Sequence, residues 1–335
     1  MNNTAKIIRE EINNYHDTIN AIVGFMNIYR YNDREKELRK DVYVFQGRKF
    51  DVPEVEEVDF VTPDIAINLP TGAGIVGEVK HTFPKNEKYW ISTFEQLLKY
   101  DNNLIGWFTD DEKIDLHDIV LLCHTSRSRK VKKFYEERST EEIKFERPFV
   151  IIEYFEFEQN KRFIQFRKEH GNLSDSEVNE RLEFGIPIPM DKLIDIYSTI
   201  KLYDSEPPIA YLLYLIWIHI IIDKAVENPK FRKLRINQTL EVTVDIEEII
   251  NKLNERFSFS PIHEKSINRQ PQIPKKEWIT RACNKFVTIG EAKWSDDKKN
   301  SLLFFFRKYN DIFDYFIERC SDDDPTIIQG NLFGD

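Results

Sequence analysis

Three charged residues, Asp64, Glu78 and Lys80, have the types and the spacing that metal-dependent cleavage of phosphodiester bonds requires. Two carboxylates provide hard oxygen ligands for Mg²⁺ or Mn²⁺, and such an ion also accepts phosphate oxygens. The ion lowers the pKa of a bound water and neutralises charge on the scissile phosphate. The lysine ammonium can position the attacking water, help to deprotonate it, or stabilise the pentacovalent phosphorane.

The elements that must position these groups are predicted to form a β-hairpin. Residues 61–69 and 74–83 are rich in Val, Ile and Phe, which favours two short strands. Residues 70–73, Pro-Thr-Gly-Ala, are typical of a turn between them. Because side chains alternate along a strand, Glu78 and Lys80 should point to the same face.

The position of Asp64 depends on the length of the turn. A three-residue loop over Thr71–Ala73 pairs Pro70 with Gly74 and places Asp64 opposite Lys80. A loop one residue shorter or longer would move Asp64 to the other face, unless a β-bulge corrected the register. The prediction is therefore geometric: all three charged groups share one face.

The alternative is that these groups are ordinary surface charges on a half-exposed hairpin. Glu78, however, lies within an apolar stretch, residues 74–79. An unpaired carboxylate is costly in such surroundings unless it binds something. The context therefore favours a functional role.

The same residues resemble the signature of the PD-(D/E)xK nuclease superfamily, most closely its RecB-like and lambda-exonuclease-like branch. Asp64, preceded by proline, and Glu78-Val79-Lys80 match its central motif, and the resemblance covers about residues 1–130. It implies an α/β, mixed-sheet, restriction-endonuclease-like core. It also implies metal ligation by Asp64, Glu78 and Val79, and a catalytic role for Lys80.

This branch carries a Gln-x-x-x-Tyr motif on the next helix, and Gln96 and Tyr100 match it. Four residues apart, they are neighbours on one helical face and could both reach the catalytic centre or the DNA backbone. The alternative is a solvent-facing glutamine and a tyrosine packed at a helix end. The family also has an acid on its first helix, for which Glu10, Glu11 and Glu35 are all candidates.

The order of predicted elements agrees with such a core and, independently, with a mixed sheet flanked by helices. Around the hairpin we expect a helix (5–30), a strand or hairpin (42–51), a helix (86–101) and a buried strand (118–125). The segment 127–133 then contains five cations, which either contact phosphates or form a solvated surface turn.

The composition fits a globular protein with room for two domains: 335 residues, 41% hydrophobic and 32% charged. A net charge of −10 requires a local basic surface for nucleic-acid binding. The three cysteines form neither a disulfide framework nor a zinc pattern, and the N-terminal segment does not resemble a signal peptide. This cysteine usage fits a reducing cytoplasm. The apolar run 209–222 is too short to span a bilayer, so we expect a buried helix.

The second half of the chain is predicted to be mostly helical. A hairpin over 149–167 is followed by a polar linker over 168–189, which divides a nuclease domain (1–170) from an accessory domain (185–320). The expected helices are 190–203, 208–227, 245–257, 275–286 and 296–318, with strand-like runs at 233–244 and 286–292. This mixture is compatible with a winged-helix-like module or with a plain helical scaffold.

Residues 321–335 are expected to be a flexible tail. Within it, Gln329–Phe333 resembles the Gln-x-x-Leu-Phe peptide with which bacterial replication and repair proteins bind the sliding clamp. The alternatives are a tail that docks on its own chain or that supports a homo-oligomer or a partner protein.

The sequence therefore predicts a Mg²⁺-dependent nuclease acting on DNA, in bacterial or phage defence (antiviral defence), restriction or repair, with RNA as an alternative substrate. A second hypothesis is a non-catalytic nuclease-fold protein that binds nucleic acid or supports assembly. A third is a transcription regulator that acts through residues 190–320.

Overall fold

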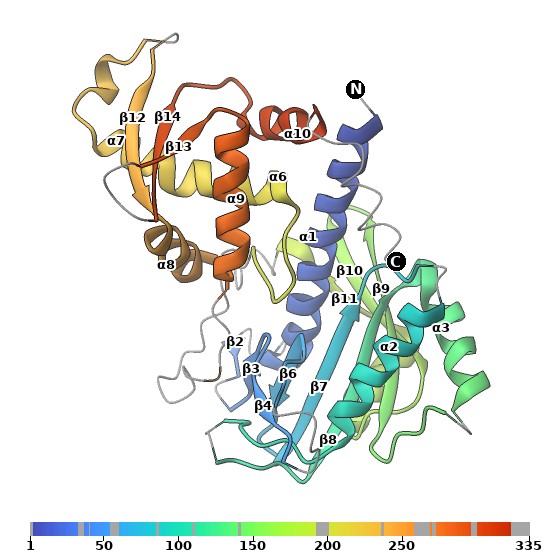
Figure 1. Cartoon of the computed structure of the whole chain (residues 1–335). Helices are drawn as coiled ribbons and strands as arrows, with labels where there is room; N and C mark the ends of the chain where they lie inside the picture. Colours follow the sequence, from blue (N-terminus) through green and yellow to red (C-terminus); the bar gives the residue numbers. More distant parts are fainter. Residues whose placement is uncertain are drawn as a thin grey trace. The chain divides into compact units, whose positions relative to one another are not determined.

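The structure is a computed structural model of the whole chain. It describes residues 3–32, 37–39, 41–53, 60–84, 87–108, 111–139, 142–191, 201–235, 238–257, 269, 273–295 and 300–322. Figure 1 labels its helices and strands. The predicted clamp-binding peptide, the proposed acid Glu35 and most of the expected helix 190–203 lie outside the described residues.

The chain forms two compact units, each discontinuous in sequence. The large-sheet unit comprises Asp17–Ile200 and Phe259–Pro271. The small-sheet unit comprises Met1–His16, Lys201–Ser258 and Gln272–Asp335. The boundary between the predicted domains, near residues 170–185, falls inside the large-sheet unit.

The large-sheet unit is built on a seven-stranded sheet with the order β11-β10-β9-β8-β7-β6-β3. Its strands are β3 (Tyr43–Phe45), β6 (Ile65–Asn68), β7 (Ala73–Lys80), β8 (Leu116–His124), β9 (Phe149–Glu158), β10 (Arg162–His170) and β11 (Ile186–Pro189). The pairs β7·β8 and β8·β9 are parallel and the other pairs are antiparallel. The predicted α/β class with a mixed sheet is confirmed.

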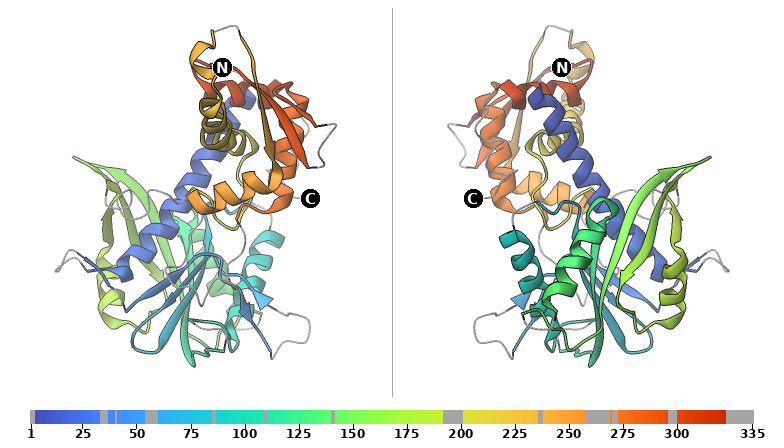
Figure 2. Two further views of the ribbon diagram at one scale, coloured as in Figure 1. Left: turned by 90° about the vertical axis from the view of Figure 1, so that its left-hand side faces the viewer. Right: turned by 90° about the vertical axis from the view of Figure 1, so that its right-hand side faces the viewer.

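Helices cover both faces of this sheet (Figure 2). One face packs against α2 (Glu87–Leu98), the 3₁₀ turn η1 (Lys99–Asp101) and α3 (Thr125–Arg138), in a core that contains Phe94, Phe134 and Tyr135. The other face packs against α1 (Asn3–Arg30), where the rings of Phe25 and Phe166 lie 6.0 Å apart. Two short pairs, β1 (Tyr31–Asn32) with β2 (Glu37–Leu38) and β4 (Phe50–Asp51) with β5 (Phe60–Val61), complete the strands.

A distant part of the chain returns to the large-sheet unit at Arg269. Its guanidinium pairs with the Asp51 carboxylate at 2.9 Å. Its carbonyl accepts a hydrogen bond of 2.9 Å from the backbone N–H of Lys49. These contacts bind residue 269 to a part of the unit more than 200 residues earlier in the chain.

The small-sheet unit surrounds a three-stranded antiparallel sheet with the order β12-β14-β13. Its elements after residue 200 are α6 (Ile209–Ile216), a π-helical segment η2 (Trp217–Ile221), α7 (Ile222–Glu227), η3 (Phe231–Lys233), β12 (Leu240–Asp245), α8 (Ile246–Phe257), α9 (Lys276–Thr288), β13 (Ala292–Trp294), β14 (Ser301–Phe306) and α10 (Ile312–Asp322). Trp217 lies at the centre of its core, in ring contact with Phe286, Phe306 and Phe316.

The helical segment Ile209–Glu227 is the one helix, among the described residues, that is long and apolar enough to cross a membrane. In its most apolar window 56% of the residues are buried inside the unit. The predicted helix is therefore present and largely buried. The expectation that it is too short to span a bilayer is wrong, because the helical segment continues to Glu227.

Two local predictions are wrong, and so is one of two open alternatives. The segment 168–189 is not a linker, because α4 (Ser176–Phe184), capped by Asp175, and β11 occupy most of it. The expected helix 296–318 begins instead with the strand β14. The cationic segment 127–133 is not a turn but part of helix α3.

Candidate active site

The hairpin β6–β7 has a three-residue loop, displaced by one residue from the predicted position. The pair Ile65–Gly77 fixes the register and the N–H of Leu69 donates to the carbonyl of Ala73 at 2.9 Å, so the loop is 70–72. Asp64 continues this register opposite Glu78 and not, as predicted, opposite Lys80. Because the shift along the partner strand is two residues, the predicted shared face is kept.

Asp64 is held at the edge of β7 by a backbone contact. Its Oδ2 accepts a hydrogen bond of 2.9 Å from the N–H of Val79, and the residue is buried. The carboxylate is thereby fixed beside Glu78. Val79, which was predicted as a metal ligand, contributes its N–H to this contact.

Glu78 is the most enclosed member of the group, with 2% of its surface exposed. Its Oε2 accepts from the Nζ of Lys80 at 3.0 Å. Its Oε1 accepts from the Nε2 of Gln96 at 2.8 Å and from the hydroxyl of Tyr100. Gln96 also donates to the Tyr100 oxygen at 3.1 Å. The structure therefore brings the five predicted side chains Asp64, Glu78, Lys80, Gln96 and Tyr100 together.

The surroundings fix the charge states of the lysine and the tyrosine. Burial alone would lower the pKa of Lys80, but the neighbouring carboxylates of Glu78 and Asp64 raise it above its usual range. Burial, and then the negative charge of Glu78, raise the pKa of Tyr100 well above its usual value. At neutral pH, Lys80 is therefore a cation and Tyr100 a neutral hydrogen-bond donor.

Of the acids proposed for the first helix, Glu35 lies outside the described residues, and Glu10 and Glu11 belong to the small-sheet unit. In the large-sheet unit, Asp17 of α1 lies 3.4 Å from the Nε2 of His81, the residue after Lys80. The sequence analysis missed this pair, and a separation of 64 residues provides no local signal for it.

His81 is stacked on a second histidine. The ring centroids of His81 and His124 are 4.8 Å apart, and both rings contact Tyr154. Tyr154 lies on β9 with the even-numbered residues that face α1, whereas Lys80 lies on the face covered by α2 and α3. Asp17 and His81 therefore lie on the opposite face of the sheet from Lys80, next to the end of β7. They do not belong to the group formed by Asp64 and Glu78.

The cationic segment begins directly after β8, at the edge of the sheet where Lys80 also lies. Parallel strands end at the same edge, and β7 pairs in parallel with β8. Of the five cations, Arg129, Lys130 and Lys133 are exposed. The first turns of α3 thus present positive charge and helix N–H groups on the side of the sheet that holds the candidate site.

The chemistry of the donors suits a hard divalent ion. Asp64 and Glu78 contribute two negative charges against the one positive charge of Lys80, and carboxylate oxygens are the ligands that Mg²⁺ prefers. The hydrogen bonds from Gln96 and Tyr100 orient Glu78 in the way that outer contacts orient metal ligands. No cluster of three or more His, Cys, Asp or Glu suited to a metal occurs among the described residues.

Comparison with known proteins assigns no family to the chain. No family model matches it, and searches of curated proteins and of solved structures found no similar protein.

Proposed function

We propose that this protein is a metal-dependent nuclease of the PD-(D/E)xK type that hydrolyses phosphodiester bonds in DNA. The observation that supports this most is the convergence of two buried carboxylates and a lysine on one face of a β-hairpin. Gln96 and Tyr100, from the helix that follows, join the same group through Glu78. The sheet with parallel strands β7, β8 and β9 agrees with a nuclease core of this type.

The metal site would consist of the carboxylates of Asp64 and Glu78, with the carbonyl of Val79 as the third ligand that the resemblance implies. A bound Mg²⁺ or Mn²⁺ supplies an activated water and neutralises charge on the phosphate. The hydrogen bond from the N–H of Val79 holds Asp64 in place, and the donors on Glu78 restrict its rotation. Preorganised ligands of this kind need little rearrangement on binding.

Lys80 would bring a positive charge to the reacting phosphate. Its Nζ lies 3.0 Å from Glu78, beside the proposed metal ligands, where an ammonium can position the attacking water or stabilise the phosphorane. The cations at the start of α3 would contact phosphates on either side of the scissile bond. DNA is preferred here as the substrate, and RNA is a comparison in the test.

The test is an incubation of the purified chain with linear, circular and single-stranded DNA and with RNA, in Mg²⁺, Mn²⁺ or EDTA. Asp64→Asn and Lys80→Ala should each reduce cleavage by about 100-fold or more. The first removes a metal ligand, and the second removes a cation that stabilises negative charge in the transition state. Thermal unfolding of each variant controls for loss of fold.

A matched control is Asp118→Asn, since Asp118 is a buried carboxylate of the same sheet that binds Ser174 at 2.6 Å. It should cleave like the wild type wherever it remains folded. Calorimetric titration with Mn²⁺ gives a second readout, in which Asp64→Asn should weaken binding. Equal cleavage by wild type and site variants would refute the proposal, and metal-independent DNA binding without cleavage would support the non-catalytic alternative.

A further inference from the structure

The small-sheet unit carries a concentration of positive charge that the proposed active site does not use. Six cations lie in two short segments, 228–241 and 305–308, which together contain one acid, Glu241. We call this set the basic patch; its members are Lys230, Arg232, Lys233, Arg235, Arg307 and Lys308. Such a concentration is notable in a chain with a net charge of −10.

The two segments are held together by direct contacts. The Nζ of Lys308 donates to the carbonyl of Leu234 at 3.3 Å. The same ammonium lies 5.5 Å from the centre of the Phe231 ring. The basic patch is therefore one surface and not two separate charge clusters.

Four of these cations are exposed and form no ion pair with any residue that the structure describes: Lys230, Arg232, Lys233 and Arg235. Arg307 pairs with the buried carboxylate of Glu291 at 3.1 Å, while 46% of its side chain stays exposed. The charge of the patch is thus largely uncompensated by the residues that the structure describes.

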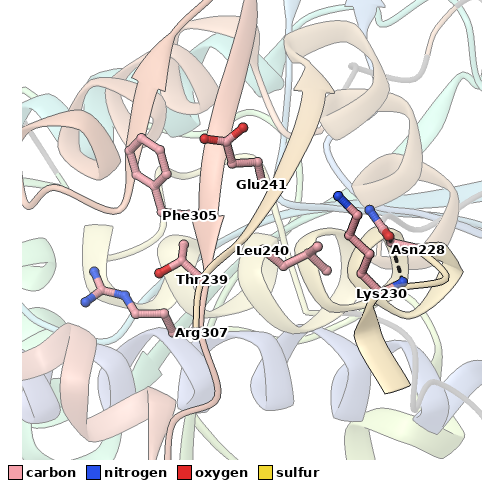
Figure 3. A pocket seen from close by; sticks show the side chains of 7 residues that line it. All are labelled: Asn228, Lys230, Thr239, Leu240, Glu241, Phe305 and Arg307. Atoms are coloured by element: carbon pink, nitrogen blue, oxygen red, sulfur yellow. Dashed lines mark hydrogen bonds between the residues drawn. The ribbon is translucent and has the colours of Figure 1, made fainter. Parts of the chain in front are cut away.

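A cavity of about 710 Å³ opens within the patch. It is lined by Asn228, Lys230, Thr239, Leu240, Glu241, Phe305 and Arg307. Figure 3 shows Lys230 and Arg307 on opposite sides of Thr239 and Leu240. The Oδ1 of Asn228 accepts from the N–H of Lys230 at 3.0 Å, which leaves its NH₂ group as a donor. The cavity therefore offers two cations against one carboxylate, that of Glu241, together with an amide, a hydroxyl and two apolar side chains.

The cations of α9 differ from those of the patch. The order α7, β12, α8, α9, β13, β14 with a β12-β14-β13 sheet is that of a winged-helix module, in which α9 would be the DNA-reading helix. Lys276 of α9 pairs with Glu247 at 2.7 Å, and Arg281 pairs with Glu206. Because Lys276 and Arg281 are already paired with acids, α9 is the weaker candidate for phosphate contact.

We propose that the basic patch binds the phosphate backbone of duplex DNA without a metal ion and without reading sequence. Unpaired cations release counterions when they meet phosphates, and amide and hydroxyl donors bind phosphate oxygens. The choice of DNA over other polyanions rests on the proposed function. The binding itself does not depend on Asp64, Glu78 or Lys80.

The test measures binding of the full chain to a fluorescent duplex of random sequence, in EDTA, at several salt concentrations. The triple variant Lys230→Ala/Arg232→Ala/Lys233→Ala should bind more weakly at low salt. The slope of log affinity against log salt should fall by about 1 for each cation removed, hence by about 3.

A matched control removes three paired cations of the same unit, Lys224, Lys252 and Lys276, by substitution with Ala. Their ammonium groups lie 2.7–3.3 Å from glutamates, so phosphate contact would require breaking those pairs. This control should keep both the affinity and the salt slope of the wild type. Thermal unfolding should show both triple variants folded.

Wild-type affinity or an unchanged salt slope in the patch variant would overturn the inference. It would also be overturned if vesicles rich in phosphatidylserine bound in a patch-dependent way while duplex DNA did not. A chain that binds through the patch but never cleaves would refute the proposed nuclease and leave this inference standing. A chain that cleaves, but whose DNA binding does not depend on the patch, would refute this inference and leave the proposed nuclease standing.

Discussion

Replacing Tyr100 by Phe tests the hydrogen-bonded group around Glu78 while leaving the core intact. The hydroxyl of Tyr100 donates to Oε1 of Glu78, and Tyr100 is fully buried. Phe fills the same space, so the change removes one hydrogen bond to a charged acceptor and creates almost no cavity. Bonds of this kind stabilise a fold by about 1.5–3 kcal/mol.

The cost should not reach the 3–5 kcal/mol or so expected for an orphaned buried charge. Oε1 of Glu78 keeps the donor Gln96 at 2.8 Å, and Oε2 keeps Lys80 at 3.0 Å. We therefore expect Tyr100→Phe to lower the free energy of unfolding of the large-sheet unit by about 2 kcal/mol. Urea unfolding at neutral pH measures this, and hydrogen exchange in β7 peptides reports on this unit alone.

Tyr135→Phe is the control, because Tyr135 belongs to the same core and makes no hydrogen bond through its hydroxyl with the described residues. Its cost should stay below about 0.5 kcal/mol. A double-mutant cycle that combines Tyr100→Phe with Glu78→Gln should give a coupling energy of about 1 kcal/mol or more. Equal costs for the two tyrosines, or no coupling to Glu78, would refute the reasoning.

Three further predictions concern the framework of the same unit. Gly74→Ala should cost about 1–3 kcal/mol in thermal or urea unfolding, because a Cβ there would lie 2.3 Å from the ring of Trp107. Burial lowers the pKa of His117 to about 4, so the unfolded chain binds a proton near its usual pKa of about 6.5 while the folded chain does not. Stability is therefore lost as the pH falls from about 6.5 towards 4, by about 2 kcal/mol at pH 5, and a pH series on His117→Gln should lack this part of the loss. Arg167→Met should destabilise the unit by about 1–3 kcal/mol in urea unfolding, because it removes the cation from the buried carboxylate of Glu153.

The arginine prediction has an internal comparison. Arg162→Met, on the same strand as Arg167, removes a more exposed ion pair with Glu156 and should cost less than about 1 kcal/mol. If both arginine variants lost the same stability, the burial argument would fail. An unchanged acid response in His117→Gln, or a fully stable Gly74→Ala, would contradict the other two predictions.

The sequence analysis succeeded where the signal is local. The charged pattern along β7 and the four-residue spacing of Gln96 and Tyr100 are set by strand and helix geometry, so their meeting at Glu78 could be anticipated. The register error also has a local cause. Gly72 adopts a φ of 77°, which closes the loop at 70–72, since glycine is the residue that most easily takes a left-handed position there.

Other errors arose from local signals that were given too little weight. In the supposed linker, Asp175 caps α4 by accepting from the N–H of Val178. Val178 and Leu182 are four residues apart and both buried, which is a helical pattern. The polar composition of the segment concealed this short amphipathic helix.

Some contacts lie beyond any local pattern. The pair Asp17–His81 and the pair Asp51–Arg269 join residues that are far apart along the chain. Nothing in the spacing of these residues predicts their partners, because only the packed fold brings them together. The cations at 230–235 and at 307–308 are evident in the sequence. That the two segments form one surface depends on the same kind of packing.

The return of Arg269 to the large-sheet unit has a consequence for synthesis on the ribosome. The seven strands of the sheet have all been translated by residue 189, yet the ion pair with Asp51 must wait until residue 269 emerges. The small-sheet unit needs its first sixteen residues and others that follow residue 272, so its completion waits longer still. The nascent chain therefore passes through an interval in which all seven strands have been made while Asp51, in the separate β4–β5 pair, still lacks its Arg269 partner.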